Sequence, residues 1–412
     1  MGSEILAYPF LFLALFFESF VLVTLLSGPA RKARERRPGG DEPSVAVIVP
    51  CWNEESTIAA TAESLLALDY PAHKLEIILV NDGSTDGTKA AMDRFASYPQ
   101  VRIIHKENGG KHTALNAGIA ATNAELVGCL DADSFVEPDA LREIIPHFSR
   151  PKVAAVTAAM SIHQPKNLIQ HMQNAEYTFG IAMRHALASI NSLYVTPGPF
   201  SFYRRSALEA VGPFRHGHQT EDMEMALRLQ RAGYEIENAP RARVYTQSPD
   251  TIPKLIKQRT RWTAGFLRNT LGEYRPLVGN RRHGVLGVLV LPVALIAVAS
   301  SILLFLVAIV QTATSLVNAF QIRAGIPLSY SLLPHSTLDW FYFPAGSFAF
   351  LAAIAVVASL SLIIIGKRVS QTPGGLKLGT ISYVLLYGFI APLWLLRATA
   401  DVTIGRHRGW RS

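Results

Sequence analysis

Long apolar segments near both ends of the chain constrain its fold more than any other feature of the sequence. Residues 5–27 form one such segment, and residues 285–310 and 345–366 form two more. Each is long enough to cross a bilayer as a helix. Residues 379–396 form a weaker candidate that contains a glycine and a proline. The polar sequence between the first two segments is therefore expected to fold as a domain attached to a membrane.

The first apolar segment predicts a retained membrane anchor. It has no positively charged residues before it and no small-residue cleavage site after it, so it lacks the pattern of a cleaved signal peptide. Glu18 interrupts the segment. This carboxyl either faces other helices or makes a functional polar contact within the membrane.

The charge distribution follows the apolar segments. The formal net charge of +8 arises entirely from residues 280–412, where ten basic and two acidic residues lie between and after apolar runs. This placement indicates membrane-flanking charge and argues against a nucleic-acid-binding surface. A basic block at residues 31–37 predicts that the polar domain after it is cytoplasmic. In a reducing compartment, Cys51 and Cys129 are expected to be free thiols with packing roles.

The number of membrane crossings stays open at three or four. If all three C-terminal segments cross, the Arg-rich tail at 397–412 ends outside, against the positive-inside rule. If one of them is re-entrant or interfacial, the tail returns to the cytoplasm.

Residues 43–250 predict an α/β domain with a mostly parallel sheet and helices on both faces. Short β-branched runs alternate there with segments of helical spacing, which is the pattern of such sheets. The predicted strands are Ser44–Val49, Leu75–Val80, Val101–His105 and Glu125–Leu130, and the predicted helices are 56–68, 86–97 and 112–122. Ligands of these sheets bind beyond the carboxyl ends of the strands.

Polar side chains collect at those strand ends. Asn53 and Glu54 follow the first strand, Asp82 follows the second, and Asp131 and Asp133 follow the fourth. Any one of them is also typical of a turn or a helix cap. Because three strand ends converge, we expect a binding site at this edge of the sheet.

Asp131 and Asp133 suggest a metal site, and Lys111 suggests a phosphate site beside it. The alternate carboxylates of Asp131 and Asp133 match the oxygen ligands that Mg²⁺ or Mn²⁺ takes together with substrate phosphates. Lys111 follows two glycines at the start of a predicted helix, where backbone N–H groups and a positive charge can meet a phosphate. The chain contains no NTPase P-loop and no dinucleotide fingerprint after the first strand.

Two later motifs extend the pattern. Glu221 and Asp222 open a helical stretch, where acids are also favoured simply by the helix dipole. Gln258, Arg261 and Trp262 have the spacing of one helix face within an amphipathic run. That face suits a sugar ring or a diphosphate, and it also suits an interfacial helix with a Trp anchor and snorkelling cations.

Taken in order, the motifs resemble those of the membrane-embedded, processive family-2 inverting glycosyltransferases, such as poly-N-acetylglucosamine, chitin-oligosaccharide, hyaluronan and cellulose synthases. The resemblance covers about residues 44–275. The motifs that carry it are VNDGSTDGT, GGKHTALNAG, CLDADS, GPFSFYRR, TEDMEM and QRTRW. It implies a GT-A nucleotide-sugar domain, a UDP-sugar donor and a glycan or lipid acceptor, with membrane lipids and an unknown export or regulatory partner around it.

The resemblance also implies roles for matching positions on the donor side. Asn53, Glu54 and Asp82 would contact uridine, and Lys111 would face the sugar diphosphate. Asp131 would face the diphosphate as well, and with Asp133 it would hold Mg²⁺ or Mn²⁺.

On the acceptor side, the resemblance implies that Asp222 is the general base, with Glu221 beside it. Gln258, Arg261 and Trp262 would cover the diphosphate, and Trp262 with Gly198 would meet the acceptor.

Two departures distinguish this sequence from many relatives of the resembled type. His112 stands where many have a small residue, and the membrane part is small, which favours the shorter poly-N-acetylglucosamine or chitin-oligosaccharide type. A non-processive glycolipid enzyme and a non-catalytic membrane scaffold are the alternatives. The expected parts are a helix at 1–30, a basic linker at 31–42, the GT-A domain at 43–250, an interface helix at 251–280 and a membrane region at 281–412.

Overall fold

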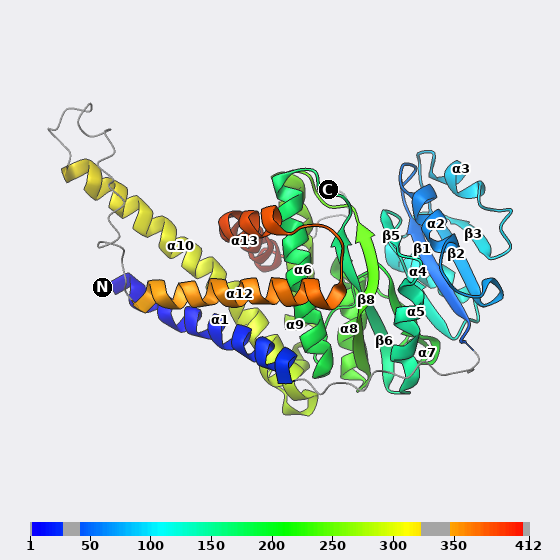
Figure 1. Ribbon diagram of the computed structural model, residues 1–412, viewed down its shortest axis with the longest axis horizontal. Coiled ribbons are helices and arrows are strands. Elements are labelled where there is room, and N and C mark those ends of the chain that lie inside the picture. Colours follow the sequence, from blue (N-terminus) through cyan, green and yellow to red (C-terminus); the bar gives the residue numbers. More distant parts are fainter. Residues whose placement is uncertain (1, 28–41, 323–346, 407–412) are drawn as a thin grey trace.

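The computed structural model describes residues 2–27, 42–322 and 347–406 (Figure 1). The basic block at 31–37 and the end of the Arg-rich tail, residues 407–412, lie outside the described residues.

One mixed sheet of eight strands forms the centre of the described polar domain, in the order β3-β2-β1-β4-β7-β6-β8-β5. The first four strands in the chain are all mutually parallel, as predicted, whereas β7 pairs antiparallel with β4 and β6, and β5 pairs antiparallel with β8. The strands are β1 Val45–Cys51, β2 Leu75–Asp82, β3 Val101–Lys106, β4 Leu126–Cys129, β5 Ser134–Val136, β6 Val153–Ile162, β7 Ser201–Arg204 and β8 Glu235–Thr246.

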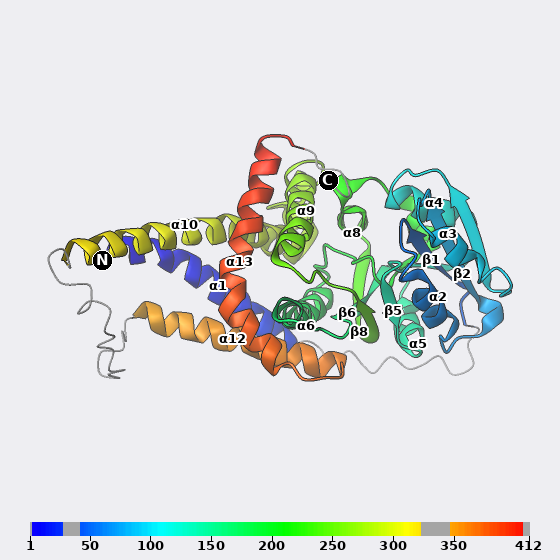
Figure 2. The same ribbon diagram turned by 90° about the horizontal axis from the view of Figure 1, so that it is seen from above.

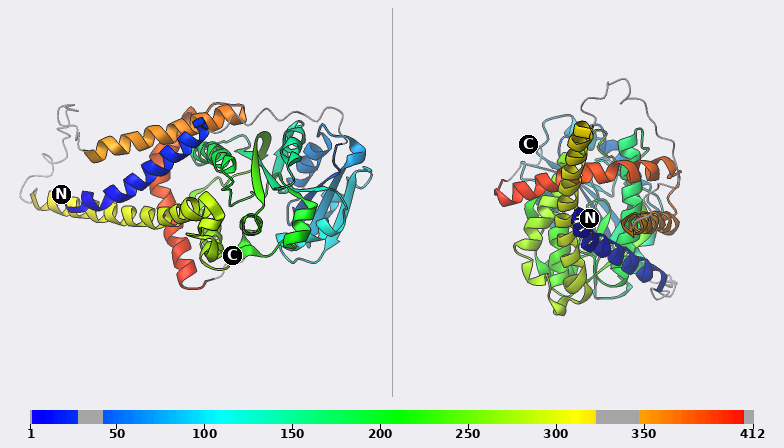
Figure 3. Two further views of the ribbon diagram at one scale, coloured as in Figure 1. Left: turned by 90° about the horizontal axis from the view of Figure 1, so that it is seen from below. Right: turned by 90° about the vertical axis from the view of Figure 1, so that its left-hand side faces the viewer.

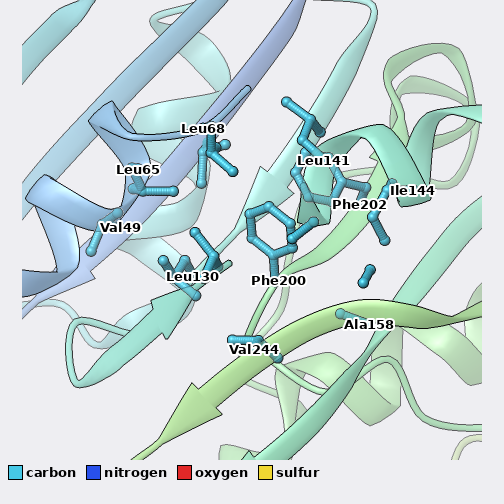
Figure 4. Packing of buried hydrophobic residues seen from close by; sticks show 14 of the residues in the cluster. Val49, Leu65, Leu68, Leu130, Leu141, Ile144, Ala158, Phe200, Phe202 and Val244 are labelled. Carbon is cyan, nitrogen blue, oxygen red and sulfur yellow. The ribbon is translucent and has the colours of Figure 1, made fainter. Parts of the chain in front are cut away.

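Helices cover both faces of this sheet, which confirms the predicted fold class. Successive residues of β1 point into different hydrophobic clusters: Val47 and Val49 pack with Leu65 of α2, and Ile48 packs with Leu115 of α4. Figure 4 shows part of the first cluster, in which the rings of Phe202 on β7 and of Phe200 just before it lie between strands and helices. The helices of the domain are α2 Ile58–Leu66, α3 Thr88–Asp93, α4 Lys111–Ala120, α5 Ala140–Ile144, α6 Leu168–Ser189, α7 Arg205–Val211, α8 Glu221–Arg231 and α9 Ile252–Leu271.

Four helices in the described residues are long and apolar enough to cross a membrane. They are α1 Gly2–Ser27, α10 Leu291–Ile322, α12 Ser347–Ser370 and α13 Lys377–Thr403. Figure 2 shows that α1, α10 and α12 extend away from the domain in a similar direction, whereas α13 runs across them. The two views of Figure 3 agree with this arrangement. Helix α13 packs against α6 and α9.

Polar contacts anchor this helical region at two points. The Ser359 hydroxyl of α12 donates a hydrogen bond of 2.5 Å to Glu18 Oε1 of α1, so Glu18 faces another helix. At the end of α13, the Arg268 guanidinium of α9 donates to the backbone oxygen of Asp401 in its last turn and to that of Arg406 after it, at 3.1 and 2.5 Å. The end of the described chain therefore lies against the polar domain.

Candidate active site

A cavity of about 670 Å³ lies where the carboxyl ends of the parallel strands meet α6, α8, α9 and α13. Every predicted site residue except Asn53 lines it: Glu54, Asp82, Lys111, Asp131, Asp133, Gly198, Glu221, Asp222, Gln258, Arg261 and Trp262. Residues that are up to 208 positions apart in the sequence thus share one cavity.

Asn53 organises the turn beneath the cavity. Its backbone is left-handed, with φ of 57°, a conformation that Asn tolerates better than most residues. Its N–H donates to Ser84 Oγ at 3.0 Å, and its side-chain oxygen accepts from the Thr85 N–H at 2.8 Å. The next N–H, of Glu54, donates to Thr88 Oγ1 at 2.7 Å. These bonds tie the turn after β1 to the loop after β2.

Asp82 fixes the glycine turn that precedes α4. Its carboxylate accepts from Lys106 Nζ at 2.6 Å and from the backbone N–H groups of Gly109 and Gly110 at 3.0 and 2.8 Å. Gly110 has φ of +89°, which suits glycine. The turn thereby places Lys111 at the first position of α4.

Lys111, which lines the cavity, is held by two carboxylates. Its Nζ lies 2.6 Å from Asp131 Oδ1 and 3.3 Å from Glu221 Oε1. Burial opposes the charge on Lys111, but the carboxylates of Asp131, Glu221 and Asp222 outweigh it and raise its pKa. A Cβ at position 198 would lie 2.7 Å from Lys111 Nζ, so only Gly198 leaves room for this ion pair.

Asp133 has an environment that suits a cation. Burial, followed by the charges of Asp131 and Glu54, raises its pKa to about 7. The hydroxyls of Ser134 and Thr246 donate to its Oδ1 at 3.1 and 3.4 Å. A divalent cation would offset the repulsion among these carboxylates.

The carboxylate pair fits a magnesium-type or manganese-type ion that takes its other ligands from phosphate and water. Within the described residues, no group of three or more His, Cys, Asp or Glu side chains is arranged to hold a metal.

Glu221 and Asp222 occupy the first two positions of α8. Burial is the largest cause that raises the pKa of Asp222, to about 6, and the charge of Glu221 adds to it, while Lys111 opposes both. Asp222 Oδ1 also accepts from the Met223 N–H at 2.8 Å, so a local helix-terminal role coexists with exposure to the cavity. A carboxylate with this pKa can accept a proton at neutral pH.

Helix α9 presents Gln258, Arg261 and Trp262 to the cavity together, as their spacing predicts. The Arg261 guanidinium donates to the backbone oxygen of Gln219 at 3.3 Å, which ties α9 to the loop before α8. Gln258 Oε1 is buried and has no hydrogen-bond partner among the described residues.

The structure adds Arg259, which the sequence analysis did not identify. Its guanidinium lies 4.2 Å from the centroid of the Trp262 ring and 5.4 Å from that of Tyr177, and it pairs with Glu176 of α6 at 2.7 Å. The Tyr387 hydroxyl of α13 donates to the second Glu176 oxygen at 3.4 Å. This network joins α6, α9 and α13 beneath Trp262.

A signal for the α13 contribution exists in the sequence. Tyr383 and Tyr387 stand one helical turn apart in the weakest apolar segment, and both line the cavity. Two tyrosines on one face of such a segment indicate contact with a polar site.

Comparison with known proteins agrees with this geometry. Residues 43–265 match the family described as glycosyltransferase like family 2. Poly-beta-1,6-N-acetyl-D-glucosamine synthase of Staphylococcus epidermidis is 33% identical over 241 residues, 58% of each chain. The synthase of the same name from Staphylococcus aureus strain COL is 33% identical over 224 residues, 54% of each chain. The matched region therefore spans little more than half the length of these relatives.

A solved structure resembles the chain along nearly its whole length. This structure is mannosyltransferase PcManGT from Pyrobaculum calidifontis in complex with GDP-Man and Mn²⁺. The match covers 98% of this chain and 99% of the PcManGT chain, with a TM-score of 0.66. At 20% sequence identity, this likeness shows the fold alone.

Proposed function

Because the chain belongs to glycosyltransferase family 2 and carries apolar helices of membrane-spanning length, we propose that it transfers N-acetylglucosamine from a UDP-sugar to a growing β-linked glycan. The observation that carries this proposal is one cavity that holds Asp222, the Lys111–Asp131 pair and Asp133 beside the α9 face. The identity of 33% to poly-beta-1,6-N-acetyl-D-glucosamine synthases supports the choice of sugar.

The donor is proposed to lie across the strand ends. Glu54, Asp82 and the turn held by Asn53 would contact the uridine. The charges of Lys111 and Arg261 would face the diphosphate, since both are cations that line the cavity. Stabilising the charge that develops on the leaving diphosphate is the main electrostatic task of such a site.

The carboxylates of Asp133 and Asp131 are the residues that would hold Mg²⁺ or Mn²⁺. When bound, the ion supplies Lewis-acid stabilisation of the diphosphate. PcManGT, which has this fold, was solved with Mn²⁺.

Asp222 is proposed to be the general base. An acceptor hydroxyl attacks the anomeric carbon in line with the departing diphosphate, the bond to the diphosphate breaks, and Asp222 takes the hydroxyl proton. Attack on an α-linked donor from the opposite face gives a β linkage. Proton transfer of this kind contributes about 10²–10⁴-fold to a rate, and alignment of the two substrates contributes further.

The acceptor is proposed to approach from the side of α9 and the membrane helices. Trp262 offers a flat aromatic surface of the kind on which sugar rings stack, and Gly198 leaves space beside the Lys111–Asp131 pair. Because α6 and α13 line the same cavity, a product formed there lies next to the membrane region. This proximity supports processive synthesis coupled to export, with the domain on the cytoplasmic side where UDP-sugars are made.

The test is sugar transfer by the purified, reconstituted protein. UDP-N-acetylglucosamine and UDP-glucose are supplied separately, released UDP is measured, and the product is sized. A ladder of N-acetylglucosamine oligomers is the expected result. A single sugar retained on lipid would instead assign the chain to glycolipid synthesis, and absence of UDP release with every donor would contradict the proposal.

A further inference from the structure

One wall of the cavity comes from a single face of α6. Tyr177, Gly180, Arg184 and Leu187 follow one another at intervals of three and four residues, so they lie along one side of the helix. Apart from Arg184 and the tyrosine hydroxyl, this wall, which we call the α6 wall, is apolar. Met183 and Leu193 continue the apolar lining beside it.

The opposite side of α6 contacts the membrane helices. Ala182 and Ala186 are fully enclosed against Val21 of α1 and Leu362 of α12. Gly366 of α12 lies so close to the α6 backbone that a Cβ there would meet the Thr178 oxygen. Figures 1 and 2 show α6 between these helices and the sheet. The α6 wall therefore stands where the membrane region joins the domain.

Arg184 is a half-buried cation without a counter-charge in the described residues. Its Nε and Nη2 atoms are shielded from solvent and have no hydrogen-bond partner there. Burial lowers its pKa to about 10, so the guanidinium still carries its charge at neutral pH. An uncompensated buried charge is strongly unfavourable, and proteins ordinarily pair such groups.

Two other cations that line the cavity are paired with carboxylates, as Arg184 is not. Lys111 has Asp131 and Glu221 within 3.3 Å, and Arg259 has Glu176 at 2.7 Å. Both are thus neutralised by the protein itself. Arg184 lines the same cavity, and its charge is left for a ligand to neutralise.

We propose that Arg184 binds the phosphate group of a membrane lipid whose chains lie along the apolar α6 wall. Guanidinium and phosphate form strong, charge-assisted hydrogen bonds. The apolar lining and the contact of α6 with α1 and α12 favour an amphiphile over a free anion. This site goes beyond the proposed function, because a growing glycan of N-acetylglucosamine carries no charge and the diphosphate of the UDP-sugar is proposed to face Lys111 and Arg261.

Gly180, which has no side chain, leaves space for the Arg184 guanidinium. A Cβ at position 180 would lie 3.2 Å from Arg184 Nη1, so even an alanine at Gly180 would press on that nitrogen. Gly180→Ala is therefore a second variant that disturbs the site without removing its charge.

The experiment is native mass spectrometry of the full-length protein in detergent, titrated with phosphatidic acid. Diacylglycerol with the same chains provides the tail without the phosphate, and inorganic phosphate provides the anion without the tail. The variants are Arg184→Met, Arg184→Lys and Gly180→Ala. Arg282→Met, which removes an exposed cation near the start of α10, controls for general attraction of anionic lipid.

We expect the wild-type protein and Arg282→Met to retain phosphatidic acid equally and diacylglycerol weakly. Arg184→Met should weaken retention of phosphatidic acid at least tenfold, Gly180→Ala should weaken it less, and Arg184→Lys should keep part of it. Equal retention by the wild-type protein and Arg184→Met would overturn the site. Competition by inorganic phosphate at equal concentration would overturn its assignment to a lipid.

Two further measurements keep the result separate from folding and from sugar transfer. Because Arg184→Met removes an unpaired charge whose Nε and Nη2 atoms are enclosed, its thermal unfolding midpoint should equal or exceed that of the wild-type protein. A lower midpoint would contradict the description of Arg184 as uncompensated. UDP binding should be unchanged in Arg184→Met, and its loss would show that Arg184 belongs to the donor site instead. Lipid retention is measured without any sugar donor, so failure of the proposed transfer reaction leaves this test intact.

Discussion

At the scale of single residues, Asp133 and Asp222 share one physical cause for their unusual proton affinity. Burial disfavours the ionised form of each carboxyl, and a neighbouring carboxylate adds to the effect. Their neighbours differ, however. Lys111 lowers the pKa of both carboxyls, but at Asp133 the charges of Asp131 and Glu54 act more strongly than Lys111, whereas at Asp222 Lys111 acts more strongly than Asp131. This difference suits Asp133 to a cation and Asp222 to a proton.

Replacing Asp222 by Asn should abolish most sugar transfer and leave donor binding intact. The amide cannot take a proton from the acceptor, so a loss of about 10²–10⁴-fold in kcat is expected. Steady-state UDP release and UDP binding by calorimetry measure the two effects. Asp250→Asn, an exposed carboxylate on the loop before α9, is the matched control and should keep full activity. Full activity of the Asp222→Asn variant would contradict the proposal that Asp222 is the general base.

The rate should also depend on pH through Asp222. Because its pKa is raised to about 6, the carboxylate is protonated below that pH and cannot accept a proton. We expect log kcat/KM to rise with pH and to level off above about pH 6, as a base with that pKa requires. An acidic limb near pH 4, the range of an ordinary aspartate, would contradict this prediction.

Mn²⁺ should stabilise the protein through Asp133. An ion that binds only the folded state adds about 2.7 kcal/mol at a concentration 100 times its Kd. The thermal unfolding midpoint of the wild-type protein should rise on addition of Mn²⁺, and that of Asp133→Asn should not. Without metal at pH 8, Asp133→Asn should be the more stable protein, because the ionised Asp133 with its raised pKa is destabilising there. An equal response of both proteins to Mn²⁺ would exclude Asp133 as a ligand.

At the scale of helices and strands, the buried Arg259–Glu176 pair connects α9 to α6. Removing one partner leaves the other charge buried, so Glu176→Ala should lower the free energy of unfolding by about 3–5 kcal/mol. The exposed Lys254–Asp250 pair, whose lysine lies on the same helix, provides the control. Asp250→Ala should leave the free energy of unfolding nearly unchanged, because the pair is exposed to solvent. Denaturant unfolding measures both, and equal effects would contradict the role of the buried pair.

The residue composition of each strand explains which strands could be predicted from the sequence. Strands β1 to β4 are β-branched or apolar runs bounded by turn residues, and all four lie within about two residues of their predicted bounds. Strand β6 is rich in alanine, which is more typical of helices, and it forms through long-range parallel pairing with β8. Strand β8 carries charges and a proline, which hide its β pattern.

The site was predictable where chemistry follows strand ends and helix spacing, and not where it depends on packing. Asp131 and Lys111 belong to recognisable local motifs. Arg259 lies on an amphipathic helix, where an arginine normally faces solvent, and its partner Glu176 is 83 residues away on another helix. Only the packing of α6 on α9 reveals that this charge is buried.

At the scale of the whole molecule, the direction of α13 bears on the number of membrane crossings. Helices α1, α10 and α12 extend away from the domain, whereas α13 runs across them (Figure 2). One face of α13 is buried on the domain through Ile390 and Trp394, and the other exposes Leu385 and Phe389. An exposed apolar face on a helix that packs against α6 and α9 and runs across the other membrane helices fits a position along the membrane rather than through it.

We therefore expect three crossings, with the end of the chain on the same side as the catalytic domain. Single cysteines at Tyr98 in the domain, at Ile404 after α13 and at Phe320 near the far end of α10 would test this, since all three positions are exposed. The native Cys51 and Cys129 are buried and should contribute little background.

A membrane-impermeant maleimide should label Tyr98→Cys and Ile404→Cys in inverted vesicles, and Phe320→Cys in right-side-out vesicles. The Arg268 bonds to Asp401 and Arg406 hold the end of the described chain against the domain. Tyr98→Cys and Ile404→Cys are therefore expected to be labelled from the same side. Labelling of Ile404→Cys together with Phe320→Cys would instead require α13 to cross. In that case the Arg-rich tail would lie outside, against the positive-inside rule, and the contacts of Tyr387 with the cavity network would have to break.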